Sequence, residues 1–348
     1  MSSLRPVSGT AEEVLALLRS WNSADDEPAP LVVQTSGSTG EPKGVLLSRA
    51  ALRASATGTA ARLGGHGEWL MNLPATFVAG LQVLFRSVLA DSDPVMQTGS
   101  FVEAARRMTG DRRFVSVVPT QLHRLLADDG STDALRAFAA VLVGGAAVPT
   151  PLRERAAASG VHVVATYGMS ETCGGCVYDG VPLDGVAVAV DAEPSTGSGE
   201  AGRIRIAGPV LFDGYDERAD VSEAALVDGW FLTNDLGRLD DDGRLEVLGR
   251  IDDVILSGGV NVPAAAVAAR LGEHAAVSAA EVVGVDDEEW GARVVAFVVG
   301  DLDLDAAREW VAAVHPRSWA PRDLRRVTAI PLLHNGKVDR LTLREWAT

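Results

Sequence analysis

A stretch rich in glycine and hydroxyl residues constrains this chain most. It spans residues 34–45 and follows the apolar residues 31–33, which predict a short buried strand. Glycine has no Cβ, so the backbone here can bend sharply and approach a ligand closely. Backbone N–H groups, hydroxyls and one lysine charge suit phosphate oxygens. We therefore predict a phosphate-binding loop, and a plain polar turn is the alternative. The residues of the predicted loop are Thr35, Ser36, Gly37, Ser38, Thr39, Gly40 and Lys43.

Composition limits the classes of protein to consider. The chain has 348 residues, enough for one large and one smaller domain, and 47% hydrophobic residues, enough for a sizeable core. A net charge of −16 argues against nucleic acid or an anionic membrane as a main partner. No apolar run approaches the roughly 18 residues of a membrane span, and the N-terminus does not read as a signal peptide. We expect a cytoplasmic protein.

Two residue types are scarce, and their positions are informative. Cys173 and Cys176 form Cys-Gly-Gly-Cys, which supplies two of the four ligands of a structural zinc, so ordinary reduced thiols are favoured over metal or redox use. Lys43 and Lys337 are the only lysines among 31 basic residues. Arginine does not replace lysine at a close phosphate or carboxylate contact. We expect both lysines to be functional, with chance retention as the alternative.

The order of predicted elements gives the fold class. Strands and helices alternate through the first half, which favours an α/β fold whose large, layered N-terminal domain has mostly parallel sheets. Ligands of such sheets bind at the carboxyl ends of strands, where we place three loops, the phosphate loop included. Short alternating strands over about 186–248 predict a small β-rich subdomain. Helices at 264–271 and 305–313 with strands at 280–285 and 293–299 predict a small α+β C-terminal domain. The expected domains are 1–251 and 252–348, joined by a hinge.

Residues 34–45 resemble the phosphate loop of the adenylate-forming superfamily, which includes acyl- and aryl-CoA synthetases, adenylation domains and luciferases. Residues 167–172, Tyr-Gly-Met-Ser-Glu-Thr, resemble its Tyr-Gly-x-Thr-Glu motif. Residues 230–237 resemble its Trp-x-x-Thr-Gly-Asp-x-Gly motif, with Asn234 replacing a glycine. Residues 249–255 resemble its hinge, and residues 331–340 its Pro-x-x-x-x-Gly-Lys-x-x-Arg motif. The motifs span nearly the whole chain in the family order.

Two segments resemble one group within the superfamily, the o-succinylbenzoate–CoA ligases of menaquinone biosynthesis, and especially their short actinobacterial form. They are residues 79–82 and 172–183, the second of which contains both cysteines. Phe77 stands where the superfamily often has a histidine at the acyl pocket. A core phenylalanine at a strand–helix junction is the alternative for this position.

The resemblance implies a role for each matching residue. Lys43 would hold the ATP phosphates, Glu171 a Mg²⁺ ion, and Lys337 would bridge the acid and the α-phosphate. Besides the phosphate loop, the implied nucleotide-binding residues are Gly144, Gly145, Ala146, Tyr167, Gly168, Met169, Ser170, Asp235 and Arg250. The implied acyl pocket is Phe77, Val78, Gly80 and Leu81, the CoA path is Ser257, Gly258 and Gly259, and the hinge is Asp252. A solvated loop carboxylate is the alternative for Glu171, and a turn residue for Asp235.

The implied reaction uses o-succinylbenzoate, ATP, Mg²⁺ and CoA. The acid would be activated as an acyl-adenylate and then transferred to CoA. Three alternatives stay open: another aryl- or acyl-CoA ligase, an adenylation module for a carrier protein, and a non-catalytic nucleotide-binding protein. The sequence also leaves a homodimer open.

Overall fold

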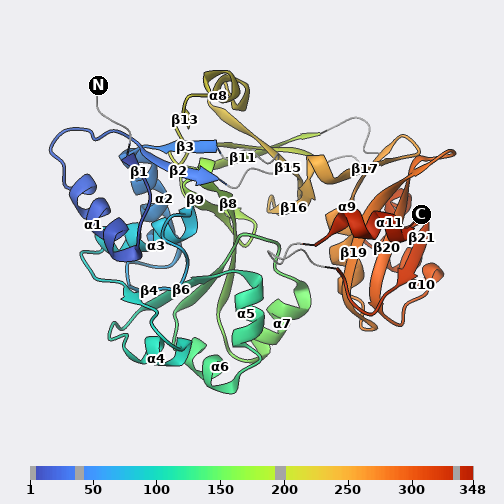
Figure 1. Cartoon of the computed structure of the whole chain (residues 1–348), viewed down its shortest axis with the longest axis horizontal. Coiled ribbons are helices and arrows are strands. Elements are labelled where there is room, and N and C mark those ends of the chain that lie inside the picture. Colours follow the sequence, from blue (N-terminus) through green and yellow to red (C-terminus); the bar gives the residue numbers. More distant parts are fainter. Residues whose placement is uncertain (1–4, 36–42, 193–200, 332–337, 348) are drawn as a thin grey trace. The chain divides into compact units, whose positions relative to one another are not determined.

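The computed structural model describes residues 5–35, 43–192, 201–331 and 338–347 (Figure 1). The chain divides into two compact units. The N-terminal unit comprises Met1–Val188 and Ile206–Leu232, and the C-terminal unit comprises Ala189–Arg205 and Thr233–Thr348. The division falls within three strands, β11 (Ala187–Ala192), β12 (Gly202–Ala207) and β15 (Trp230–Leu239). The hinge boundary between 251 and 252 stays a prediction.

A seven-stranded sheet of order β10-β9-β8-β7-β6-β4-β5 forms the centre of the N-terminal unit. Its five strands from β8 to β5 are parallel, as predicted, and β9 and β10 join antiparallel. Parallel strands covered on both faces are apolar throughout, as Ala140–Val143 illustrates. The strands are β4 (Glu68–Met71), β5 (Val95–Met96), β6 (Arg113–Val117), β7 (Ala140–Val143), β8 (Val163–Met169), β9 (Gly174–Tyr178) and β10 (Val181–Pro182).

Helices cover both faces of this sheet (Figure 1). Successive strand residues point to opposite faces, so Trp69 packs in one core cluster and Leu70 in the other. The first cluster includes residues of α1 (Ala11–Asn22), α2 (Arg49–Arg62) and α3 (Val78–Leu89). The second includes residues of α4 (Phe101–Arg106), α5 (Pro119–Leu125), α6 (Asp129–Leu135) and α7 (Thr150–Ala158).

Local capping signals set most helix starts. The sequence predicts Thr10 and Ser48 as N-caps, and both are confirmed: Thr10 forms a capping box with Glu13 at α1, and Ser48 caps α2. The sequence also predicts Thr120 as the N-cap of a helix that begins at Gln121, and this is wrong because α5 begins at Pro119. Proline suits the first helical position, where no backbone N–H is needed.

A separate four-stranded sheet carries the flanks of the predicted phosphate loop. Its order is β1 (Arg5–Pro6), β2 (Leu31–Thr35), β3 (Lys43–Leu47) and β13 (Gly214–Tyr215). β2 and β3 are antiparallel, with Thr35 opposite Lys43. The predicted position at the end of a strand in a parallel sheet is therefore wrong for this loop, because the chain between Thr35 and Lys43 joins two antiparallel neighbours.

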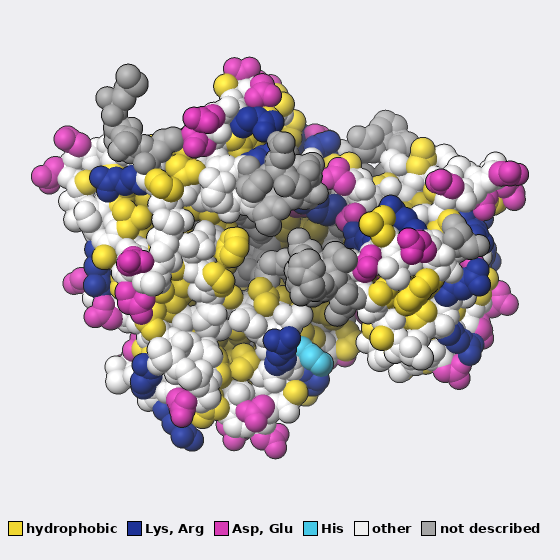
Figure 2. Space-filling view, viewed as in Figure 1, with side chains coloured by type: hydrophobic (Ala, Val, Ile, Leu, Met, Phe, Trp, Pro, Cys, Tyr) yellow, Lys and Arg dark blue, Asp and Glu magenta, His cyan; other side chains and the backbone are white. Residues whose placement is uncertain are grey.

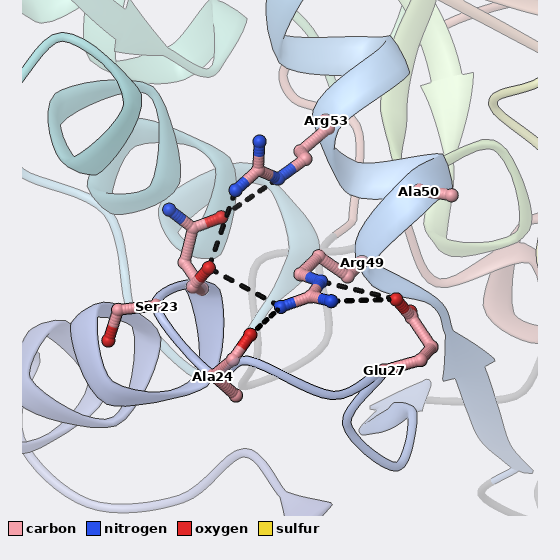
Figure 3. A pocket seen from close by; sticks show the side chains of 7 residues that line it. Ser23, Ala24, Glu27, Arg49, Ala50 and Arg53 are labelled. Atoms are coloured by element: carbon pink, nitrogen blue, oxygen red, sulfur yellow. Dashed lines mark hydrogen bonds and ion pairs between the residues drawn. The ribbon is translucent and has the colours of Figure 1, made fainter.

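Two arginines fix the segment that leads into β2 (Figure 3). Arg49 donates from Nη1 to the carbonyl of Ala24 at 2.7 Å and pairs from Nη2 with the Glu27 carboxylate at 2.9 Å. Arg53 Nε donates to Asn22 Oδ1 at 3.0 Å. Both arginines lie on α2, so this helix holds the end of α1 and the linker after it.

A five-stranded sheet organises the C-terminal unit. Its order is β18-β17-β20-β19, and β21 pairs with β20. The predicted helices and strands of this region are present, each within a few residues of its expected bounds. The elements are β17 (Val254–Ser257), β18 (Val260–Pro263), α9 (Ala264–Gly272), β19 (Val277–Asp287), β20 (Gly291–Gly300), α10 (Leu304–Ala312), β21 (Asp323–Arg326) and α11 (Arg340–Ala347).

Shorter elements complete the described chain. They are η1 (Ser170–Thr172), β11 (Ala187–Ala192), α8 (Ala219–Ala225), β14 (Leu226–Val227), β16 (Leu245–Arg250), η2 (Ile251–Asp253) and η3 (Arg317–Trp319). Acidic and basic side chains are interspersed over the visible face of each unit (Figure 2). Among the described residues, no helix has both the length and the apolar character to cross a membrane.

Candidate active site

Three residues that are far apart in the sequence meet in the N-terminal unit. Tyr215 Oη donates a hydrogen bond of 2.9 Å to Oε1 of Glu171. The ammonium of Lys43 lies 5.2 Å from the centroid of the Tyr215 ring, within range of a cation–π interaction. The antiparallel pairing of β13 with β3 places Tyr215 beside Val45. Two predicted site residues, Lys43 and Glu171, are therefore joined through a tyrosine.

The chemistry of this cluster follows from its burial. Tyr215 is buried, and burial together with the nearby Glu171 carboxylate raises the pKa of its phenol. The phenol thus stays protonated at neutral pH and acts as the donor. The backbone also fixes Glu171, since its carbonyl accepts a hydrogen bond of 2.9 Å from the Phe212 N–H.

Side chains from two helices hold the turn after Glu171. Cys173 adopts a left-handed conformation with φ of 51°. Its carbonyl accepts hydrogen bonds from Ser55 Oγ of α2 at 3.0 Å and from Gln82 Nε2 of α3 at 2.7 Å. Gln82 and Cys173 belong to the two segments that resemble o-succinylbenzoate–CoA ligases. The turn that follows Glu171 is thus fastened to the helix of the predicted acyl pocket.

The two cysteines are structural in character. Both are buried, and burial raises the pKa of Cys173 and raises that of Cys176 to about 12. Thiols with raised pKa values stay protonated and unreactive at neutral pH. Among the described residues, no three His, Cys, Asp or Glu side chains are grouped to hold a metal ion. Ordinary reduced thiols remain the prediction for this pair, and their burial supports it.

The predicted adenine-side residues lie on or directly after two neighbouring strands, β7 and β8. Gly144, Gly145 and Ala146 follow β7, so they lie at the carboxyl end of a parallel strand as predicted. A Cβ on Gly144 would lie 2.6 Å from Thr166 Oγ1, which explains a glycine there. Residues 167–169 lie within β8 and not in a loop after it. The apolar run 161–166 predicts a strand that ends at Thr166, but β8 continues to Met169 by pairing with β9 across a register shift.

The predicted acyl-pocket residues begin α3. Phe77 precedes the first turn and is 51% exposed, so the core alternative for this side chain is wrong. Gly80 and Leu81 are buried. A Cβ on Gly80 would lie 2.2 Å from the Pro74 carbonyl oxygen, so only glycine fits without rearrangement. Phe77 is thus the predicted pocket residue that is most accessible to a ligand.

In the C-terminal unit, the predicted ribose ligands face each other. Asp235 and Arg250 are cross-strand partners of β15 and β16, with 4.0 Å between Oδ1 and Nε. Arg250 Nη2 also lies 3.4 Å from Oδ2 of the predicted hinge residue Asp252. The Asp235 side chain is 15% exposed. Asn234, which replaces the family glycine, accepts from Arg203 Nη1 at 3.3 Å.

The predicted CoA-path residues form the turn between β17 and β18. Gly258 and Gly259 have φ of 58° and 77°, which favours glycine at both positions. The Gly258 N–H donates to the Trp290 carbonyl at 2.8 Å. Ser257 is buried at the end of β17.

Several predicted site residues lie outside the described part of the chain. They are Ser36, Gly37, Ser38, Thr39, Gly40 and Lys337. Sequence reasoning, in turn, assigned no role to Tyr215. The one signal available was scarcity, because the chain has three tyrosines.

Comparison with known proteins identifies the family. The pattern of the AMP-binding enzyme family matches residues 11–216, and that of its C-terminal domain matches residues 266–337. The chain belongs to the AMP-binding enzyme family. This confirms the predicted adenylate-forming superfamily and, with the structural similarities below, the predicted fold class.

Two relatives within this family have sequences similar to that of the chain. A probable 2-succinylbenzoate–CoA ligase of Mycobacterium tuberculosis is 46% identical over 347 residues, covering 95% of this chain and 88% of that protein. A 2-succinylbenzoate–CoA ligase of Geobacillus kaustophilus is 37% identical, covering 79% of this chain and 60% of that protein. The chain thus spans about 60% of the length of the second relative.

Solved structures agree with the sequence comparison. The o-succinylbenzoate CoA synthetase of Bacillus subtilis, in complex with its acyl-adenylate intermediate, matches with a TM-score of 0.75 and 30% identity. That match covers 90% of this chain and 68% of the other. The same enzyme with ATP and a magnesium ion matches with a TM-score of 0.73 and 29% identity, covering 90% of this chain and 69% of the other.

Proposed function

We propose that this protein is an AMP-forming 2-succinylbenzoate–CoA ligase of menaquinone biosynthesis. The observation that carries the proposal is the cluster of Lys43, Tyr215 and Glu171, in a chain that is 46% identical to a probable ligase of this specificity over 95% of its length. Lysine and carboxylate beside the flanks of a glycine-rich loop suit a magnesium-bound polyphosphate.

In the first half-reaction, a substrate carboxylate oxygen attacks the α-phosphorus of ATP. The bond from that phosphorus to the bridging oxygen breaks, and pyrophosphate leaves with the electron pair. Charge develops on phosphoryl oxygens, so catalysis rests on positioning and electrostatic stabilisation. In our assignment, Lys43 and the loop hold the β- and γ-phosphates, and Lys337 bridges the carboxylate and the α-phosphate. Tyr167 stacks on adenine, and Asp235 and Arg250 bind ribose.

In the second half-reaction, the CoA thiolate attacks the acyl carbonyl of the adenylate, forming a thioester and releasing AMP. The thiol proton is lost to solvent or to the departing phosphate. We assign Ser257, Gly258 and Gly259 to the pantetheine path. We assign Asp252 as the residue whose backbone rotates between half-reactions, since such movements exclude water and separate the steps.

Glu171 fits a magnesium ion that arrives with the nucleotide. Mg²⁺ in such sites takes one or two carboxylates, substrate phosphates and waters. Tyr215 engages Oε1 of Glu171 and thereby orients the carboxylate. When bound, the ion would neutralise phosphate charge; no larger carboxylate cluster is required for that role.

Pyrophosphate release from ATP by the purified protein tests the proposal. The panel comprises o-succinylbenzoate, benzoate, coumarate and fatty acids, each with and without CoA. We expect release with o-succinylbenzoate, and its CoA thioester when CoA is added. Release with another acid only would favour the alternative, another aryl- or acyl-CoA ligase, for which the exposed Phe77 would be a pocket determinant. Silence across the panel with retained ATP binding would favour either an acid outside the panel or a non-catalytic nucleotide-binding protein.

We further propose a cytoplasmic location, with no nucleic-acid or membrane partner, and keep a homodimer as an open arrangement. The net charge of −16 supports the absence of an anionic polymer or surface as partner. Light scattering of the purified protein as it elutes from a size-exclusion column measures the oligomeric state directly.

A further inference from the structure

An arginine at the start of α11 joins two acidic residues of the C-terminal unit. Arg340 Nη1 lies 2.7 Å from Oδ1 of Asp253, and Nη2 lies 3.3 Å from Oε1 of Glu281. Asp253 belongs to η2 and directly follows the predicted hinge residue Asp252. Glu281 lies on β19. One guanidinium thus links three elements: η2, β19 and α11.

This link is more enclosed than the ion pair of Arg326 and Asp301 in the same unit. The Glu281 side chain is 12% exposed, and those of Asp253 and Arg340 are 33% and 36% exposed. By contrast, the pair of Arg326 and Asp301 has side chains 53% and 89% exposed. A planar guanidinium reaches two carboxylates at once, which the single ammonium of lysine does less well.

The backbone around Arg340 is also fastened. The Asp339 N–H donates to the Pro331 carbonyl at 2.9 Å. The Asp339 carboxylate accepts from Thr342 N at 3.1 Å and from Thr342 Oγ1 at 2.9 Å. Pro331 and Asp339 are described residues on either side of the segment that contains Lys337. A backbone hydrogen bond thus joins Pro331, which precedes this segment, to Asp339, which directly precedes Arg340.

We propose that Arg340 is a positioning residue that couples Lys337 to the hinge, by tying the chain three residues after the lysine to the residue after Asp252. This inference rests on the proposed function. A rotation at Asp252 would then carry Asp253, Arg340 and the start of α11 together. Lys337 would be delivered and withdrawn with the hinge. Adenylation, which uses Lys337, depends on the link more than thioester formation does.

The two half-reactions are measured separately for the Arg340→Gln variant. ATP–pyrophosphate exchange with o-succinylbenzoate reports adenylation, and transfer from synthetic o-succinylbenzoyl-adenylate to CoA reports the second step. We expect exchange to fall on the order of 10²-fold, as for a misplaced catalytic group, and transfer to change by less than about 3-fold because it does not use Lys337. Asp253→Asn should reproduce this split, and Arg340→Lys should lie between Arg340→Gln and the parent protein.

Arg326→Gln is the matched control, because it removes another ion-paired arginine of the same unit. We expect it to leave both half-reactions unchanged. If Arg340→Gln slows both steps equally, or if its loss of thermal stability alone accounts for its loss of activity, Arg340 has a structural role and the proposal is wrong.

Hydrogen–deuterium exchange separates this inference from the proposed function. Arg340→Gln and Asp253→Asn should each speed amide exchange in peptides covering η2 and residues 338–347, and Arg326→Gln should not. If the parent protein shows no adenylation with any acid, the proposed function fails, and these exchange rates still decide whether the coupling exists. Unchanged rates in both variants would overturn it.

Discussion

Replacing Tyr215 by phenylalanine isolates one hydrogen bond at the candidate active site. The change removes the hydroxyl that donates to Glu171 at 2.9 Å, and it keeps the ring beneath the Lys43 ammonium. A hydrogen bond to a charged acceptor contributes about 1.5–3 kcal/mol. At about 1.4 kcal/mol per tenfold change, that energy corresponds to roughly 10–100-fold in an equilibrium constant. The carboxylate would lose its orientation and one ordered partner.

We therefore expect Tyr215→Phe to raise the Mg²⁺ concentration needed for half-maximal adenylation by about 10-fold or more. Pyrophosphate exchange is measured across a Mg²⁺ titration at saturating ATP and acid. Tyr178→Phe is the control, because it removes another buried phenol, which lies 2.9 Å from Thr59 Oγ1. The maximal rate should change less than the Mg²⁺ requirement, since Lys43 and Glu171 remain.

An unchanged or lowered Mg²⁺ requirement for Tyr215→Phe would refute this reasoning. It would mean that Glu171 either does not meet the ion or is oriented without the phenol. An equal shift in Tyr178→Phe would instead attribute the effect to general loosening of the unit.

Three further changes test other parts of the structure. Lys337→Ala should lower adenylation by about 10²–10³-fold, as for loss of one transition-state donor, and unchanged pyrophosphate exchange would contradict its assignment. Gly80→Ala should destabilise the fold by about 1–3 kcal/mol, because the added Cβ would meet the Pro74 carbonyl at 2.2 Å; urea unfolding measures this. Burial raises the pKa of Glu281 above its ordinary value of 4.5, so its contribution to stability is present below that value and is lost as pH rises through the raised pKa. Urea midpoints from pH 4 to 8 should therefore fall less steeply for Glu281→Gln than for the parent, and parallel curves would show that Glu281 does not titrate in this range.

Local signals account for the parts of the fold that the sequence predicts well. The capping box of Thr10 and Glu13 acts within one helical turn, and it sets the start of α1. The apolar run Ala140–Val143 is buried on both faces, and it predicts β7 without knowledge of its neighbours. Family motifs added candidate residues, such as Lys43 and Glu171, that the structure brings together through Tyr215.

Strand pairing explains what could not be predicted. The antiparallel pairing of β2 with β3 and the extension of β8 to Met169 depend on which strands become neighbours. The periodicity of one strand does not identify the strand that will pair with it, so neither feature follows from local sequence. Tyr215 reaches Glu171 only because β13 pairs with β3, although the two residues are 44 positions apart.

The two segments that resemble one group of ligases illustrate the same limit from the functional side. Residues 79–82 and 172–183 are far apart in the sequence, and nothing in either segment predicts that they touch. In the structure, Gln82 donates to the Cys173 carbonyl at 2.7 Å, two residues after Glu171. Ser55 donates to the same oxygen. This carbonyl therefore joins the helix of the predicted acyl pocket to the turn after Glu171, the predicted magnesium ligand. Acid specificity and adenylation would then share one structural support, and a change at Gln82 is expected to affect both.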